Sequence, residues 1–334
     1  MDIERIDPLD LDLETADEIA AIEAASLEAA GLELPHLVGP AKLKFLQLRS
    51  NNRPVAGLWL ARENGHLVGL ATTHLPIEDN TDSAHLNGVV HPSARRQGVG
   101  RALLDAALGL AREEGRKKVY AGAFRGGAGG PALEAMGFTS TGLGVNAVRR
   151  VDLHTAPHGL WDRLYDEAAE RASDYELVRL VGPTPDDLLD DMVSLHAAIN
   201  DAPLDDPEAE EDHWDADRVR SYDAAMAGRR QTVHRVLARH RASGEWAGIS
   251  ILCVDEFSPS VAFQEDTSVV RSHRGHRLGL LMKADMQRWI SDERPEVAAS
   301  ITWNATTNHH MIAVNERLGA RVVAEHVTYR LRDE

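Results

Sequence analysis

The chain contains one strand–turn–helix pattern twice. Residues 89–108 read VVHPSARRQGVGRALLDAAL, and residues 268–286 read SVVRSHRGHRLGLLMKADM. In both segments a β-branched apolar run leads through an arginine-bearing turn into an apolar helix, and the equivalent glycines, Gly100 and Gly279, are 179 residues apart. A helix that starts in this way presents free backbone N–H groups, which favour a phosphate or pyrophosphate. The repeat therefore predicts two copies of one nucleotide-binding domain.

Length and composition agree with a two-domain chain. The 334 residues suffice for two domains of about 150 residues each. No run of 18 apolar residues occurs, and the first residues, MDIERIDPLDLDLE, are acidic, which argues against a membrane span and a secretory signal. A single cysteine, Cys253, excludes a disulfide within the chain and favours a cytoplasmic location.

Negative charge is concentrated in the second half of the chain. Residues 1–150 carry 19 acidic and 16 basic groups, whereas the remainder carries 34 and 20. Nine of the acids fall between Asp201 and Asp217. This balance argues against nucleic acid as a partner. The acidic stretch is either a solvated loop or a region that attracts a cationic substrate.

The apolar and polar patterns of the two halves follow the same order of helices and strands. We expect a first domain over residues 1–150, a linker helix over 151–175 (ending with HGLWDRLYDEAAERASDY), and a second domain over 176–334. The last apolar segment, VVAEHVTYRLR, is predicted to be the final strand of the second domain.

These residues resemble the GNAT superfamily of acyl-CoA-dependent N-acetyltransferases. The family's loop is written R/Q-x-x-G-x-G/A after a strand, usually with Val-x-Pro just upstream. Residues 90–92 and 95–100 match it fully, and residues 269–271 and 274–279 match it with Arg277 in place of the first glycine. The double arrangement resembles the tandem GNAT proteins of actinobacteria, a group that includes mycothiol synthase. The resemblance implies an α/β fold with two GNAT-type domains in tandem, each a mixed, splayed sheet flanked by helices.

The resemblance also implies acetyl-CoA as the co-substrate, and no metal. The loops would hold its pyrophosphate, and its pantetheine arm would insert beside the strand that precedes each loop. In the first copy the residues expected to bind it are Gly88, Val89, Val90, Arg95, Arg96, Gln97, Gly98, Val99, Gly100 and Arg101. In the second copy they are Thr267, Ser268, Val269, Arg274, Gly275, His276, Arg277, Leu278, Gly279, Asn304 and Asn308.

Acetyl transfer to an amine needs a base, because an amine with a pKa of roughly 10 is protonated at neutral pH. Glu265 and Asp266 lie on the strand before the second loop, where the family often keeps its base. Adjacent strand residues face opposite sides, so only one of them, with Glu265 favoured, is expected to face the site. The family's usual tyrosine acid is replaced by Asn315 and, in the first copy, by Leu133. Water, Tyr329 or no acid at all are the alternatives, since a thiolate is a tolerable leaving group.

The resemblance thus implies an acetyl-CoA-dependent N-acetyltransferase that acts on a small, cationic primary amine. The second copy, with its strand carboxylates and asparagines, is expected to be the catalytic one, unless His74 or His85 is the base of an active first copy. Two alternatives stay open: a mycothiol-synthase-like acetyltransferase and a non-catalytic acyl-CoA sensor or scaffold. Neither nucleic acid nor a membrane is expected as a partner, and a homodimer is left open.

Overall fold

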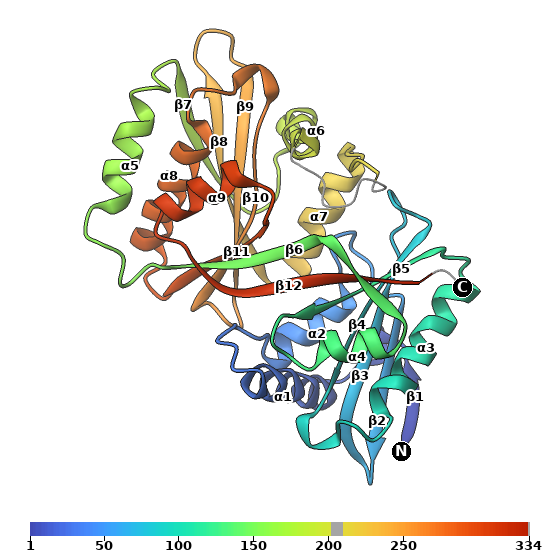
Figure 1. Ribbon diagram of the computed structural model, residues 1–334. Coiled ribbons are helices and arrows are strands. Elements are labelled where there is room, and N and C mark those ends of the chain that lie inside the picture. Colours follow the sequence, from blue (N-terminus) through green and yellow to red (C-terminus); the bar gives the residue numbers. More distant parts are fainter. Residues whose placement is uncertain (202–209, 333–334) are drawn as a thin grey trace. The chain divides into compact units, whose positions relative to one another are not determined.

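The computed structural model describes residues 1–201 and 210–332, which belong to two compact units. Unit 1 comprises Met1–Asn146, Asp205–Glu210 and Val323–Glu334, and unit 2 comprises Ala147–Leu204 and Glu211–Val322. Both units consist of strands and helices (Figure 1). Residues 202–209, the centre of the predicted acidic stretch, lie outside the described residues.

Unit 1 is a mixed sheet with helices packed on it (Figure 1). Its strand order is β1-β2-β3-β4-β5-β12-β6. Strands β4 and β5 are parallel, and β1–β2, β2–β3, β3–β4 and β5–β12 are antiparallel pairs. The elements are β1 (Asp2–Ile6), α1 (Leu13–Ala29), α2 (Gly39–Gln47), β2 (Gly57–Glu63), β3 (His66–His74), β4 (Ser83–Val90), α3 (Val99–Glu113), β5 (Lys118–Phe124), α4 (Gly129–Ala135), the first part of β6 (Phe138–Asp152) and most of β12 (Arg321–Leu331).

Unit 2 repeats this plan. Its strand order is β6-β11-β10-β9-β8-β7, with β10 and β11 parallel and β7–β8, β8–β9 and β9–β10 antiparallel. The predicted linker helix is α5, whose Leu164 and Ala168 are buried in the core of this unit. The elements are α5 (Leu160–Ala169), β7 (Tyr175–Val181), α6 (Leu189–Ala197), α7 (Ala216–Gly228), β8 (Gln231–His240), β9 (Trp246–Asp255), β10 (Val261–Val269), α8 (Leu278–Glu293), β11 (Ala299–Ala305) and α9 (His309–Arg317).

Each sheet is buried on both faces, because alternate residues of its central strands enter two different cores. In β2, Leu58 and Leu60 belong to the core shared with α1, whereas Trp59 and Ala61 belong to the core shared with α3. Fully burying one leucine-sized side chain contributes about 1.5–3 kcal/mol. Strands buried on both faces read as continuous apolar runs, which explains sequences such as GISILCV in β9.

The C-terminal strand β12 completes unit 1, not unit 2. It pairs antiparallel with β5, where His326 lies opposite Phe124 and Tyr329 lies opposite Ala121. Val327 and Tyr329 are buried in the core beside α3. The sequence analysis placed this strand in the second domain, and the structure places it in the first.

The end of β6 makes the opposite exchange. Residues 147–152 belong to unit 2, where Val151 is buried in the core beside α8 and the N–H of Leu153 donates to the carbonyl of Ala298 at 2.8 Å. The units therefore differ from the simple succession 1–150, 151–175 and 176–334 that the repeat suggested. An alternating pattern predicts that a segment is a strand, but it does not say which sheet the strand joins.

Tyr329→Ala tests the placement of β12. Loss of this buried ring should destabilise unit 1 by about 3 kcal/mol. Amide hydrogen exchange, followed by mass spectrometry, should then become faster in β5 and stay slow in β9 of unit 2. Val322→Ala, at a position of the same strand that is 50% exposed, is the matched control and should change little. Faster exchange confined to β9 would contradict the placement.

Candidate functional site

The loops that precede α3 and α8 have the same backbone conformation. Two residues in each are left-handed: Arg96 (φ 64°) and Gly98 (φ 88°) in unit 1, and Gly275 (φ 89°) and Arg277 (φ 58°) in unit 2. Glycine adopts this conformation at little cost, whereas arginine is strained in it. Each loop contains one arginine and one glycine in this conformation, and their order is reversed between the two loops. Arg277 therefore keeps the backbone conformation of the glycine that it replaces.

Both loops end in a helix start whose amides are left open; we call residues 95–101 cradle 1 and residues 274–280 cradle 2. Neither helix has a side-chain hydrogen bond at its N-cap. The first N–H groups that bond within the helices belong to Ala102 and Leu281. The N–H groups before them have no partner inside the helix, and the helix dipole favours an anion in front of them.

The equivalent arginines Arg95 and Arg274 brace the cradles. The Nε atom of each donates to the last carbonyl oxygen of the preceding strand, at 3.2 Å for Arg95 and 3.1 Å for Arg274. The outer nitrogens bond the hydroxyl of Ser26 at 2.9 Å and the carboxylate of Asp201 at 2.7 Å, respectively. These side chains tie loop to strand, while Arg96 is exposed.

The side chain of Arg277, which departs from the family's loop pattern, is engaged by a carboxylate. Its guanidinium forms an ion pair with Glu167 of α5, and Glu167 also pairs with Arg317 of α9. A Cβ atom added at Gly279 would meet no atom within 4 Å. The space around the start of α8 is therefore open in spite of the substitution.

In each unit the strand before the cradle separates from its parallel neighbour. Strand β4 pairs with β5 as far as Leu86, four residues before its end, and β10 pairs with β11 as far as Phe263, six residues before its end. Residues 88–90 and 267–269, which the resemblance places beside the thioester, lie on the separated stretches. Both units thus have the splayed sheet that the resemblance implied.

Side chains on the separated part of β10 are used within the protein. The hydroxyls of Thr267 and Ser250 lie 2.9 Å apart, and Ser268 donates to the carbonyl of Leu195 at 2.8 Å. On β4 the corresponding Gly88 has no side chain. The groups left for a ligand on these stretches are therefore backbone N–H and C=O groups.

Strand β10 carries a β-bulge at Glu265 and Asp266. The three-residue step from Gln264 to Thr267 faces a two-residue step on β9, so the two acids share one partner position. A bulge breaks the alternation of side chains, and both acids have exposed side chains. The strand alternation on which the expectation of a single site-facing acid rested is therefore interrupted at this point.

The protein around the bulge raises the pKa of both acids. Desolvation, followed by the charge of Asp266, raises the pKa of Glu265 to about 7. Desolvation, followed by the charge of Asp212, raises the pKa of Asp266 to about 6. Because both side chains keep exposed surface, they meet water on one side and protein on the others. Groups that titrate near neutral pH can exchange protons in the working range of an enzyme.

Three residues that the sequence analysis did not single out act on Glu265. The charges of Arg229 and Arg235 lower its pKa, and a smaller effect of Tyr222 of α7 lowers it further. These three residues are 6%, 7% and 0% exposed. The only signal in the sequence is that Tyr222 takes an apolar position of its helix, and nothing in the spacing connects it with a strand residue so far along the chain.

The asparagines expected near the cofactor and the thiol have partners within unit 2. The side-chain amide of Asn315 donates to Oδ1 of Asn304 at 2.7 Å, and both residues are buried. Asn308 caps α9 by accepting from the N–H of Met311 at 3.1 Å. These bonds tie β11 to α9. An amide is not an acid at physiological pH, so Asn315 cannot replace the proton of a tyrosine.

Unit 1 has different chemistry at the same place. Strand β4 pairs with β3 in unbroken register, with His85 opposite His74, and the residues at the bulge positions are Leu86 and Asn87. Desolvation, followed by the charge of Arg49, lowers the pKa of His74 to about 4, and desolvation also lowers the pKa of His85. The weak basicity of His74 makes it a poorer proton acceptor than Glu265.

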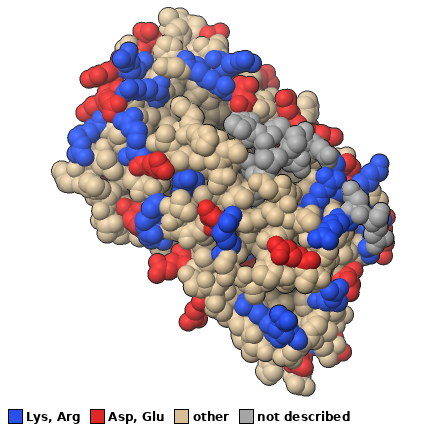
Figure 2. Space-filling model, in the orientation of Figure 1, with Lys and Arg blue, Asp and Glu red and all other residues tan. Residues whose placement is uncertain are grey.

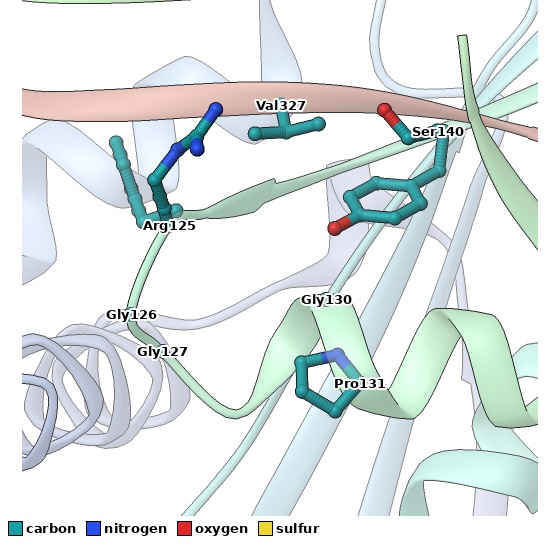
Figure 3. A pocket seen from close by; sticks show the side chains of 9 residues that line it. Arg125, Gly126, Gly127, Gly130, Pro131, Ser140 and Val327 are labelled. Carbon is teal, nitrogen blue, oxygen red and sulfur yellow. The ribbon is translucent and has the colours of Figure 1, made fainter. Parts of the chain in front are cut away.

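Unit 1 contains a cavity of about 260 Å³ where β12 passes the start of α4. Figure 3 shows Arg125 and Val327 on one side and Gly130 of α4 opposite them. The lining residues are Phe124, Arg125, Gly126, Gly127, Gly130, Pro131, Ser140, Val327 and Tyr329. Tyr329, considered above as an acid of the second copy, therefore lines a cavity of unit 1.

The described acids at the ends of the 201–217 stretch are largely engaged by their neighbours. Asp201 pairs with Arg274, Asp212 pairs with Arg218 at 3.3 Å, and Asp215 caps α7. Acidic and basic side chains are interspersed over the face shown in Figure 2. Of these acids, Asp212 affects the site directly, because its charge raises the pKa of Asp266.

Three histidines of unit 2 contact Tyr175. His273 accepts from or donates to the hydroxyl of Tyr175 at 3.0 Å, and the rings of His240 and His276 also contact Tyr175. Over residues 1–201 and 210–332, no three His, Cys, Asp or Glu residues are grouped so that they could hold a metal ion. In the same ranges no helix is long and apolar enough to cross a membrane.

Comparison with known proteins agrees with this architecture. Residues 22–129 match the Acetyltransferase (GNAT) family. A tandem GNAT protein from the clavulanic acid biosynthesis pathway, solved without AcCoA, is 25% identical, is matched over 98% of both chains, and has a TM-score of 0.77. A GCN5-related N-acetyltransferase from Sphaerobacter thermophilus is 16% identical over 98% of this chain and 95% of its own, with a TM-score of 0.68. A comparison with curated protein sequences gave no match.

The chain therefore contains a GNAT acetyltransferase domain, and along its whole length it has the fold of a tandem GNAT protein. This confirms the predicted fold class of two GNAT-type α/β domains in tandem.

Glu265→Gln should stabilise the protein above pH 7. The folded-state pKa of about 7 exceeds the ordinary value of 4.5, so the folded protein holds an extra proton between these values and loses stability as pH rises through this window. Glutamine does not ionise and removes that loss. The melting temperature of the variant relative to wild type should therefore increase from pH 4.5 to 7 and level off above. Glu256→Gln, at an exposed residue, is the control; a constant offset at all pH values would contradict the assignment.

Proposed function

We propose that this protein is an acetyl-CoA-dependent N-acetyltransferase of a small, cationic primary amine, and that unit 2 is its catalytic copy. The observation that carries the proposal is the bulge of β10, which brings Glu265 and Asp266 to the point where β10 separates from β11. The GNAT fold supports the reaction type. The two carboxylates support the choice of unit 2.

The residues of unit 2 fit acetyl-CoA as the donor. Cradle 2 has open amides for a pyrophosphate. The separated stretch over residues 267–269 leaves backbone groups for the pantetheine arm and for the carbonyl oxygen. When bound, acetyl-CoA supplies the acetyl group as a thioester, with a thiolate as the leaving group.

Glu265 is the general base in this proposal. An acceptor amine with a pKa of roughly 10 arrives protonated and must lose a proton before its nitrogen can form the new N–C bond. A carboxylate with a pKa of about 7 is a stronger base than an ordinary glutamate, and its exposed surface gives the amine or a water access to it. The C–S bond breaks as the N–C bond forms, and the thiolate takes its proton from water, because Asn315 is not an acid.

The charges around the bulge suit a cationic acceptor. Asp266 lies close enough to raise the pKa of Glu265, and Asp212 acts in the same way on Asp266. Carboxylates gathered at one place attract a cationic amine and raise its local concentration. An anionic acceptor would be repelled by the same charges, which favours diamines and amino sugars over amino acids with free carboxylates.

A second candidate function is acyl-CoA binding without turnover. It is favoured by the residues at the family's acid position, Asn315 in unit 2 and Leu133 in unit 1. Unit 1 combines an open cradle with a regular β4 that has no carboxylate at the bulge positions. We therefore assign binding without turnover to unit 1 and catalysis to unit 2.

Tryptophan substitutions at the two cradle glycines separate the copies. A Cβ at Gly100 would lie 3.6 Å from Val90, and a Cβ at Gly279 would meet no atom within 4 Å, so both variants should fold and place an indole in the cradle. Calorimetric titration of wild type with acetyl-CoA should show two equivalents, and each variant should lose one. Gly279→Trp should lower turnover by at least about 100-fold, and Gly100→Trp should spare it. The reverse pattern would assign catalysis to unit 1.

Removal of the base should lower the rate and change its pH dependence. Glu265→Gln should lower kcat by about 100-fold or more with a cationic amine, the usual contribution of a general base. In wild type, kcat/KM should rise with pH through about 7, because the carboxylate must be deprotonated. Asp266→Asn removes a charge that raises this pKa, so the midpoint should move to lower pH. The measurement is release of free thiol from pH 5 to 9, and undiminished activity of Glu265→Gln would exclude it as the base.

A further inference from the structure

The cavity of unit 1 contains a tyrosine hydroxyl for which the protein provides no partner. Tyr329 of β12 lines the cavity and is 8% exposed, and within residues 1–201 and 210–332 its hydroxyl forms no hydrogen bond. A Cβ atom at Gly130 would lie 2.6 Å from this hydroxyl, so the glycine at the start of α4 gives the phenol room. A largely buried polar group without a partner is costly, and it points to a molecule that supplies the missing hydrogen bond.

A serine hydroxyl lies beside Tyr329 on the neighbouring strand. The hydroxyls of Thr139 and Thr141 of β6 donate to the carbonyls of Arg330 and Thr328 of β12, at 3.4 and 3.3 Å. Ser140, between the two threonines, is thereby placed next to Tyr329, and it also lines the cavity.

The Ser140 hydroxyl has a free proton. Its oxygen accepts from the N–H of Gly142 at 3.3 Å, and a hydroxyl that accepts a hydrogen bond can still donate its own proton. Ser140 is exposed, so the cavity opens to solvent at this side chain. Tyr329 and Ser140 thus offer two O–H donors to a molecule in the cavity.

An arginine side chain provides the charge of the cavity. The backbone N–H of Arg125 donates to the carbonyl of Glu325 at 2.8 Å, and its Nε atom pairs with the Glu325 carboxylate at 2.7 Å. These two bonds hold Arg125 against β12 and leave the outer guanidinium nitrogens for another acceptor. Figure 3 shows Arg125, Val327 and Ser140 on one side of the cavity, with Gly130 and Pro131 of α4 opposite.

The lining selects for an anion with an apolar body. The side chains of Arg125, Ser140 and Tyr329 can all donate, and no aspartate or glutamate lines the cavity. A guanidinium and hydroxyls suit a carboxylate, whose two oxygens accept several hydrogen bonds. Val327 and Pro131 add apolar surface. The volume of about 260 Å³ is below the range of about 300–1,000 Å³ for drug-sized ligands, so the occupant is small.

We propose that this cavity is a binding site for a small organic carboxylate, held by Arg125, Ser140 and Tyr329 with its apolar part against Val327. The site goes beyond the acetyl transfer proposed for unit 2 and does not depend on it. It is also separate from the opening beside cradle 1, because β12 and β6 lie on the side of β5 that faces away from β4. Tyr329 and Val327 come from the exchanged strand, so the C-terminal segment of the chain completes the site.

The test is a titration of the full chain with benzoate, followed by NMR of valine labelled with ¹³C in its methyl groups. Val327→Ile identifies the signals of Val327. Benzoate should move them with a Kd of about 1 mM, as expected for a ligand of few atoms. Benzamide, which has the same shape without the charge, and inorganic phosphate, which has no apolar part, should each bind at least about tenfold more weakly.

Two variants test the donors. Tyr329→Phe keeps the ring and removes the hydroxyl, and Arg125→Gln removes the charge; each should weaken benzoate binding about tenfold. The matched controls are Tyr175→Phe, whose hydroxyl bonds His273, and Arg112→Gln, at an exposed arginine of α3, and both should bind as wild type does.

Several results would overturn the proposal. Val327 signals that stay in place well above the expected Kd would show that the cavity binds no carboxylate. Wild-type affinity in both Tyr329→Phe and Arg125→Gln would place benzoate elsewhere. Equal binding of benzamide would refute an anion site, and tighter binding of phosphate would refute an organic ligand. Because the titration needs no turnover, its outcome and that of the amine acetylation assay are independent.

Discussion

Each splayed sheet depends on a strand segment that comes from the other half of the sequence. Strand β5 loses β4 as a partner beyond Ala121, and β12 pairs with β5 from Tyr120 to Phe124. The end of β6 lies beside β11 in the same way. These partners lie on the edges of β5 and β11 that face away from β4 and β10, and without them the ends of β5 and β11 would have unpaired N–H and C=O groups on both edges, at a substantial cost in free energy. The exchanged segments therefore keep β5 and β11 paired on one edge where each sheet opens beside its cradle.

The bulge of β10 shows a conflict between stability and chemistry. One extra residue places two neighbouring acids opposite one residue of β9; desolvation raises the pKa of both, and the charge of Asp266 adds to it at Glu265 and that of Asp212 at Asp266. Such groups reduce the stability of the folded protein at neutral pH. In the function proposed for unit 2, they would supply a carboxylate basic enough to accept a proton. The buried Arg229 and Arg235 limit the cost by stabilising the charged form of Glu265.

The two units share a backbone and differ in side chains. Both cradles have two left-handed residues, an uncapped helix start and a bracing arginine. A helix start with open amides binds an anion through its backbone, so this function survives changes of sequence such as Arg277. Proton transfer depends on particular side chains. Unit 2 has Glu265 and Asp266 at the bulge, whereas unit 1 has Leu86 and Asn87 at the equivalent positions.

From the sequence alone, the duplicated loops, the order of strands and helices and the GNAT type of fold could be predicted, because they follow from local patterns and backbone conformations within about twenty residues. Glu265 and Asp266 were singled out as candidates in this way, since they precede a recognisable loop. The exchange of β12 and the bulge of β10 could not be predicted. Which sheet a strand joins, and whether one strand of a pair contains an extra residue, depend on contacts between distant segments, and only the folded chain brings those segments together.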